Sequence, residues 1–134
     1  MNQDEEHLKL LSVFHYVVGG ITALFALFPI FHLVFGLIMI LAPAIFEDGG
    51  DAAPAFIGWI FVIIGGMFIT LGWTMAALIL ATGRFLARKR HYLFCLTIAG
   101  LECVLMPFGT VLGVFTIIVL VRESVKRLFA ENIA

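Results

Sequence analysis

The sequence predicts an all-α integral membrane protein, a four-helix bundle with both its N- and C-termini in the cytoplasm. Three observations lead to this prediction. Of the 134 residues, 63% are hydrophobic and 13% are charged, whereas a soluble domain has roughly 45–50% apolar and about 25% charged residues. Apolar stretches at 10–46, 52–82 and 92–121 each exceed the roughly 20 residues that a spanning helix needs. Lys and Arg gather near helix ends that can share one side of the membrane.

The elements follow from these stretches and their interruptions. We expect a single transmembrane domain over residues 1–134, with helices at about 8–46, 55–86, 92–106 and 110–129. The first helix contains Pro29, which has no turn-forming residue beside it, so a bend within one helix is favoured over a reversal. The stretch EDGGDAAP at 47–54 combines acids, glycines and a proline, which is typical of a loop before a helix.

The segment PFGT at 107–110 decides the number of crossings. Pro107 suits the second position of a tight turn and Gly109 tolerates unusual dihedral angles. If the chain reverses there, all eight basic residues lie on one side of the membrane, which favours that side as cytoplasmic. They are Lys9, Arg84, Arg88, Lys89, Arg90, Arg122, Lys126 and Arg127. A reversal is therefore predicted, and five crossings, with a further reversal at Pro29, is the alternative.

The C-terminal run PFGTVLGVFTIIVLVRESVKRLF carries a resemblance. It resembles the signature of a family of small bacterial multi-pass membrane proteins, in which a P-F-G-T-x-L-G helix precedes a short basic tail. The N-terminal HYVVGGITALFALF and the basic linker GRFLARKRHY are also similar to that family. The resemblance implies a bacterial inner-membrane location, and it implies no substrate, cofactor or catalytic residue. His32 and Glu102 are departures from the family pattern.

Two polar side chains within the apolar stretches are the candidate intramembrane site. A carboxylate in the hydrocarbon region costs about 2.5–3.5 kcal/mol on insertion scales, so Glu102 is expected to face the protein interior or water. His32 is a candidate partner for it. Glu102 is interpreted either as a proton or cation site, or as a hydrogen-bonded carboxyl that fixes helix packing.

Cofactor and metal sites are not predicted. His15 and His91 each precede a tyrosine at a similar expected depth, and facing histidines on two helices hold haem in some membrane proteins; haem is therefore kept as a minor alternative. Glu47, Asp48 and Asp51 lack the spacing of a calcium loop.

Two small-residue patterns predict close helix contacts. They are Gly109 with Gly113, and Ala77 with Ala81. No nucleophile–base set or phosphate loop is found in the sequence, and the net charge of −1 gives no reason to expect a nucleic-acid partner.

We therefore expect a non-enzymatic protein of the lipid bilayer that acts by packing with itself, as a homo-oligomer, or with a membrane-protein partner. The alternatives are an oligomeric channel or proton-coupled transporter that uses Glu102, and a haem-binding redox subunit.

Overall fold

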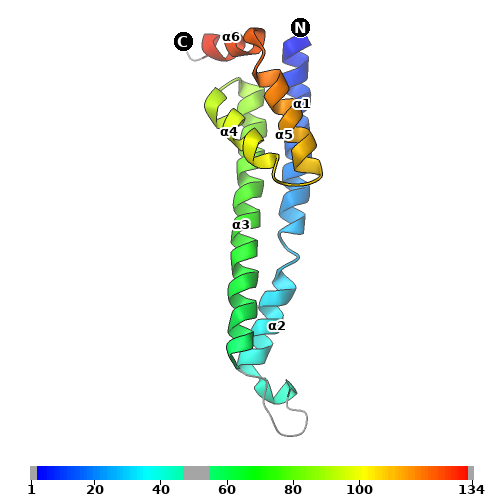
Figure 1. The fold of residues 1–134 in the computed structure, drawn as a ribbon, viewed down its shortest axis with the longest axis vertical. Coiled ribbons are helices and arrows are strands. Elements are labelled where there is room, and N and C mark those ends of the chain that lie inside the picture. Colours follow the sequence, from blue (N-terminus) through cyan, green and yellow to red (C-terminus); the bar gives the residue numbers. More distant parts are fainter. Residues whose placement is uncertain (1–2, 47–54, 133–134) are drawn as a thin grey trace. The chain divides into compact units, whose positions relative to one another are not determined.

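The structure, a computed structural model, describes residues 3–46 and 55–132. These residues form α-helices and one short 3-10 helix, with no strand among them, which confirms the all-α class. The elements, drawn in Figure 1, are α1 (Gln3–Phe25), α2 (Ile30–Leu41), η1 (Pro43–Phe46), α3 (Ala55–Arg88), α4 (Tyr92–Glu102), α5 (Phe108–Leu120) and α6 (Glu123–Glu131). The predicted acidic loop with Glu47, Asp48 and Asp51 lies outside the described residues.

Two stretches of the described chain are long and apolar enough to cross a membrane. They are Gln3–Leu41, with 39 residues, and Ala55–Arg88, with 34 residues. A third candidate arises if α5 and α6, which are bent by 78° at their junction, are taken as one span. Membrane-length helices are thus confirmed.

The chain divides into two compact units, each with its own contacts. Unit 1 comprises Met1–Ile21 and Met75–Ala134, and unit 2 comprises Thr22–Thr74. The buried apolar core of unit 1 draws on five helices. It consists of Leu8, Leu11, Leu86, Cys95, Leu112, Val119, Leu120, Val125 and Phe129.

The helix predicted over 8–46 is interrupted at Pro29, which corrects the prediction of a single element. α1 ends at Phe25 and α2 begins at Ile30. Between them the hydrogen bonds tighten to the i→i−3 pattern, since the Leu27 and Phe28 amides donate to the Leu24 and Phe25 carbonyls at 3.1 and 3.0 Å. Proline has no amide proton and its ring clashes with the preceding turn, which explains the break.

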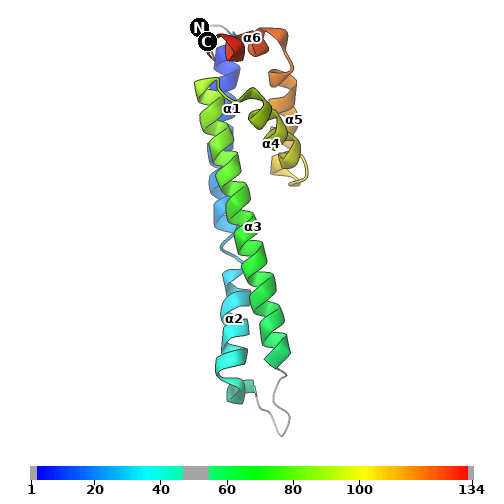
Figure 2. The same cartoon turned by 90° about the vertical axis from the view of Figure 1, so that its left-hand side faces the viewer.

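The chain keeps its direction at Pro29, and this agrees with the prediction of a bend without a reversal. Within unit 2, Ala26 faces Gly72, the Pro29–Leu33 turn faces Gly65, and Gly36 faces Gly58. Residue numbers rise on one side while they fall on the other, so the segment keeps one direction along α3 (Figure 2). The additional reversal that five crossings require is therefore absent from the described residues.

Glycine sets the helix separation in unit 2. A Cβ atom on Gly36 would lie 2.7 Å from the Gly58 carbonyl oxygen, and one on Gly58 would lie 2.9 Å from that of Gly36. Two backbones meet here without side chains between them, which is the close packing that membrane helices achieve with small residues.

The chain does reverse between α4 and α5, but the turn is formed by residues 103–107, and Gly109 lies inside α5 rather than in the turn as predicted. The Tyr92 hydroxyl donates to the Leu120 carbonyl at 3.1 Å, and the Thr110 hydroxyl donates to the Cys103 carbonyl at 2.8 Å. The two helices therefore run antiparallel (Figures 1 and 2). The predicted helix over 92–106 ends earlier, at Glu102, because residues 103–107 form the turn.

The turn itself satisfies its amides locally. The amides of Cys103, Val104, Leu105 and Met106 donate to carbonyls of residues 99, 101, 102 and 104, at 3.3, 3.1, 2.9 and 3.1 Å. Pro107, joined to Met106 by a cis peptide bond, has no amide proton to satisfy. The exposed large side chains of the turn, Val104 and Met106, are apolar. Such a turn meets the requirement that backbone groups inside a bilayer be hydrogen-bonded.

The helix predicted over 110–129 is also two elements. α5 ends at Leu120, Arg122 adopts an extended conformation (φ −62°, ψ 132°), and α6 follows. The bend lets α6 bury Val125 and Phe129, and the Phe129 ring packs edge-on against Tyr92 at 5.7 Å. A straight helix would carry these apolar side chains away from the core, which explains the correction.

Gly113 offers a direct test of the α4–α5 contact. In Gly113→Ala the new methyl group meets the Ala99 carbonyl and lies 2.8 Å from the Cys103 sulfur, so we expect a loss of about 1–3 kcal/mol in the free energy of unfolding. Gly100→Ala is the matched control, because a Cβ there has no atom within 4 Å. Reversible unfolding in mixed micelles, followed by circular dichroism, measures both variants. Equal stability of the two would contradict the close approach.

Candidate functional site

Glu102 and His15 meet inside unit 1. Glu102 is the last residue of α4 and His15 lies in the fourth turn of α1. The His15 Nε2 and Glu102 Oε2 atoms are 3.2 Å apart, and both side chains are fully buried. Two ionisable groups are thereby removed from solvent at a contact between α1 and the α4–α5 hairpin.

A second contact of His15 fixes which ring nitrogen carries a proton. The His15 Nδ1 atom lies 2.8 Å from the Leu11 carbonyl oxygen, and a carbonyl only accepts, so Nδ1 carries a proton. A buried charge is costly unless it is paired, so the imidazole beside the Glu102 carboxyl is the group that can offset its charge.

The geometry leaves the pair incompletely satisfied. The Nε2–Oε2 approach lacks the alignment of a good hydrogen bond, and Glu102 Oε1 has no hydrogen-bond partner among the described residues. An unsatisfied buried oxygen is costly. The carboxyl therefore has an acceptor oxygen that no described residue uses.

A glycine on α3 makes room for the α1 side of the site. The Ser12 hydroxyl donates to the Gly83 carbonyl at 2.7 Å, one turn before His15. A Cβ on Gly83 would lie 3.1 Å from both His15 Cβ and the Ser12 carbonyl oxygen. Nearer the N-terminal end of α1, the Glu5 carboxylate forms an ion pair with the Lys89 ammonium group. These contacts fix α1 against α3 and so fix the position of the imidazole.

The predicted partner of Glu102 is not the one found. The structure pairs Glu102 with His15, whereas His32 lies in unit 2 and stacks on Phe61, with ring centroids 6.0 Å apart. A signal for His15 exists in the sequence. It follows Leu8, Leu11 and Ser12 at the spacing of one helix face, and all of these are buried.

The structure does not bring the two candidate haem ligands into a common site. Both ring nitrogens of His15 face protein groups, while the exposed ring of His91 lies edge-on to Phe85 at 4.7 Å. Across residues 3–46 and 55–132, no group of three or more His, Cys, Asp or Glu side chains is placed to hold a metal ion.

The predicted packing residues divide into two sets. Gly109 and Gly113 are buried in the α4–α5 contact, where a Cβ on Gly109 would lie 2.6 Å from Leu105 Cβ. Ala77 is exposed and Ala81 is partly exposed on α3. The GxxxG pattern thus lies at a contact within the chain.

A double-mutant cycle tests whether His15 and Glu102 act as a pair. Replacing either one with leucine leaves the other buried without its partner, so His15→Leu and Glu102→Leu are each expected to cost about 1–3 kcal/mol in the free energy of unfolding. The double variant should be more stable than the sum of the single effects predicts, by about 0.5–3 kcal/mol. Unfolding in mixed micelles measures each variant.

Thr116→Val supplies the control for this cycle. The buried Thr116 hydroxyl donates to Leu112 on its own helix, at 2.7 Å, so its loss should add independently to that of His15. Coupling between His15 and Glu102 that is no larger than this background would show that the 3.2 Å contact carries no energy of its own.

Comparisons of the chain with protein-family models, with curated proteins and with solved structures find no match. The resemblance to small bacterial multi-pass membrane proteins therefore stays a prediction.

Proposed function

We propose that the chain is a small multi-pass protein of the bacterial inner membrane that acts by helix packing, with a second copy or a membrane-protein partner, and without catalysis. In this proposal the α1–α2 segment and α3 cross the bilayer. The α4–α5 hairpin enters from the cytoplasmic face and returns to it. Both termini are then cytoplasmic, as the distribution of basic residues favours.

The lengths of the hairpin helices support a partial insertion. α4 has 11 residues and α5 has 13 residues, which correspond to about 16 and 20 Å as helix. A hydrocarbon core about 30 Å thick exceeds both. The internally bonded turn and its apolar exposed side chains suit a position within the bilayer. The proposal therefore replaces a regular four-helix bundle with two long spans and a shorter hairpin.

One exposed stripe on α3 is the observation that carries the proposed association. Gly66, Thr70 and Thr74 recur at four-residue spacing on one face of unit 2. Gly66 has no atom within 4 Å of a Cβ position. The Thr70 and Thr74 hydroxyls donate to Gly66 and Thr70 carbonyls at 2.7 Å each. The side chains of the stripe are small, and both threonine hydroxyls form hydrogen bonds within their own helix.

Such a surface suits another helix better than lipid. Small residues let backbones approach closely, and this is a main source of association between membrane helices. The other close glycine contacts of α3, at Gly58, Gly65, Gly72 and Gly83, are used by α1 and α2 or the turn between them. The stripe on the remaining face is available to a second molecule.

Gly66→Leu tests the association without disturbing the fold. The leucine occupies open space in the isolated chain but overpacks a helix contact, which costs about 1–3 kcal/mol and weakens association roughly five- to hundredfold. Gly20→Leu, at another glycine with open space, is the control. Single-molecule photobleaching in supported bilayers measures the oligomeric state. A monomeric wild type that purifies without any other protein would contradict the proposal.

A second candidate function rests on the buried His15–Glu102 pair. Ionisable residues inside membrane proteins often form proton relays, and Glu102 Oε1 has no hydrogen-bond partner among the described residues. In this proposal the pair carries a proton as part of a channel or transporter. Proton flux into liposomes is then expected to fall at least tenfold in Glu102→Gln, because the amide does not titrate. Absent flux, or flux unchanged by the substitution, would exclude this candidate.

A further inference from the structure

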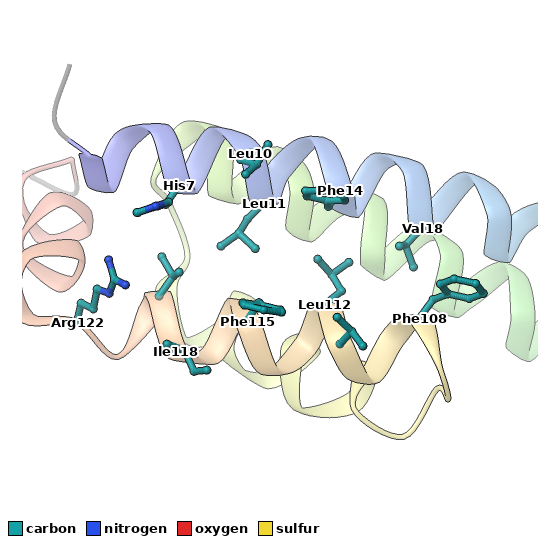
Figure 3. Close-up of a pocket in the computed structure, with 12 residues that line it drawn as sticks. His7, Leu10, Leu11, Phe14, Val18, Phe108, Leu112, Phe115, Ile118 and Arg122 are labelled. Atoms are coloured by element: carbon teal, nitrogen blue, oxygen red, sulfur yellow. The ribbon is translucent and has the colours of Figure 1, made fainter.

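Unit 1 contains an apolar pocket between α1 and α5. Its volume is about 640 Å³, within the range of roughly 300–1,000 Å³ typical of ligand sites. It is lined by Leu10 and Phe14 of α1 and by Val111 and Phe115 of α5. Figure 3 shows Phe14 on the α1 side and Phe115 on the α5 side. These four side chains are about half exposed, so the pocket is open along its side. A ligand that fills it must be largely apolar.

The pocket is polar at one end only. Figure 3 shows His7 and Arg122 at this end, and Val18 and Phe108 at the other. The His7 Nδ1 atom is buried and has no hydrogen-bond partner among the described residues. Arg122 is 46% exposed, and its contact with Asp4 is long, at 3.5 Å. The Arg122 guanidinium can therefore bind a further anionic group from outside the chain.

The bend between α5 and α6 supports a position for Arg122 at the membrane surface. The chain changes there from the apolar α5 to α6, which buries Val125 and Phe129 and exposes Arg127. An amphipathic helix of this kind lies in the plane of the interface. The pocket runs from this level along α5 toward Phe108, over about 20 Å of helix. This exceeds the half-thickness of about 15 Å that one leaflet presents.

We propose that this pocket binds one acyl chain of an anionic phospholipid, with the lipid phosphate at Arg122 and His7. Charge and shape together select this occupant. An acyl chain suits the apolar walls and the length, and a phosphate suits a guanidinium that is open to solvent. Asp4 competes for Arg122 and is displaced from it by the phosphate. The inference rests on the proposed insertion in a bilayer but not on the proposed association, since α3 contributes no residue to the pocket.

Native mass spectrometry of the full chain tests the proposal. The protein, in mild detergent, is mixed with equal amounts of phosphatidylglycerol and phosphatidylcholine that have identical acyl chains. One Lys or Arg near an anionic headgroup changes affinity about fivefold, so bound phosphatidylglycerol is expected to exceed phosphatidylcholine by about that factor. Arg122→Gln should abolish the preference. Arg127→Gln, the control in the same tail and outside the pocket, should keep it.

A second pair of variants tests the place of binding. Val111→Trp fills the pocket and should reduce retention of both lipids, whereas Val114→Trp, exposed on α5 outside the pocket, should leave it unchanged. Equal binding of the two lipids by the wild type would overturn the proposal. The same holds if Arg127→Gln acts as strongly as Arg122→Gln, or if Val111→Trp retains lipid normally. If the wild type is a dimer and Val111→Trp disrupts it, the pocket is a contact with a second copy of the chain, and the lipid proposal is overturned.

Discussion

Unit 1 depends on the reversal of chain direction between Glu102 and Phe108. The reversal brings Gly113 onto Ala99 and places the Glu102 carboxyl beside His15. It also returns the chain to the first turn of α1, where Arg122 lies near Asp4 at the polar end of the pocket. A chain that merely bent at Pro107 would separate all of these groups. Each contact of the hairpin is therefore a consequence of the same local turn.

The protein meets the cost of polar groups in an apolar surrounding in two ways. Hydroxyls bond to carbonyls within reach, as Thr116 does to Leu112 and Ser12 to Gly83. The one buried carboxyl of the hairpin lies 3.2 Å from an imidazole nitrogen, and the other nitrogen of that ring contacts the Leu11 carbonyl oxygen. Glycines also contribute to the packing, because they allow the carbonyls of one helix to lie close to the backbone of the next.

Composition and turn residues predicted the features of the fold that are set by short stretches of sequence. Composition indicated membrane-length helices, the lack of turn residues at Pro29 predicted a bend without reversal, and the Pro107–Gly109 turn predicted the reversal. The end of α5 at Leu120 was missed, because the bend after it is set by tertiary contacts such as that of Phe129 with Tyr92. The end of α4 at Glu102 was missed because the turn begins four residues before Pro107. The partner of Glu102 was missed for a similar reason. The sequence places histidines at 7, 15, 32 and 91, and the spacing of His15 with Leu8, Leu11 and Ser12 was not used to choose among them.

The reversal is tested most directly by the sidedness of the two hairpin ends. Cysteines are placed one at a time by Arg90→Cys and Arg122→Cys, in a background in which Cys95 and Cys103 are changed to serine. Each variant is labelled with a membrane-impermeant maleimide in right-side-out and inside-out vesicles. The structure predicts that both positions react from the same side of the membrane. Labelling from opposite sides would mean that the segment crosses the bilayer once, and would contradict the hairpin on which unit 1 is built.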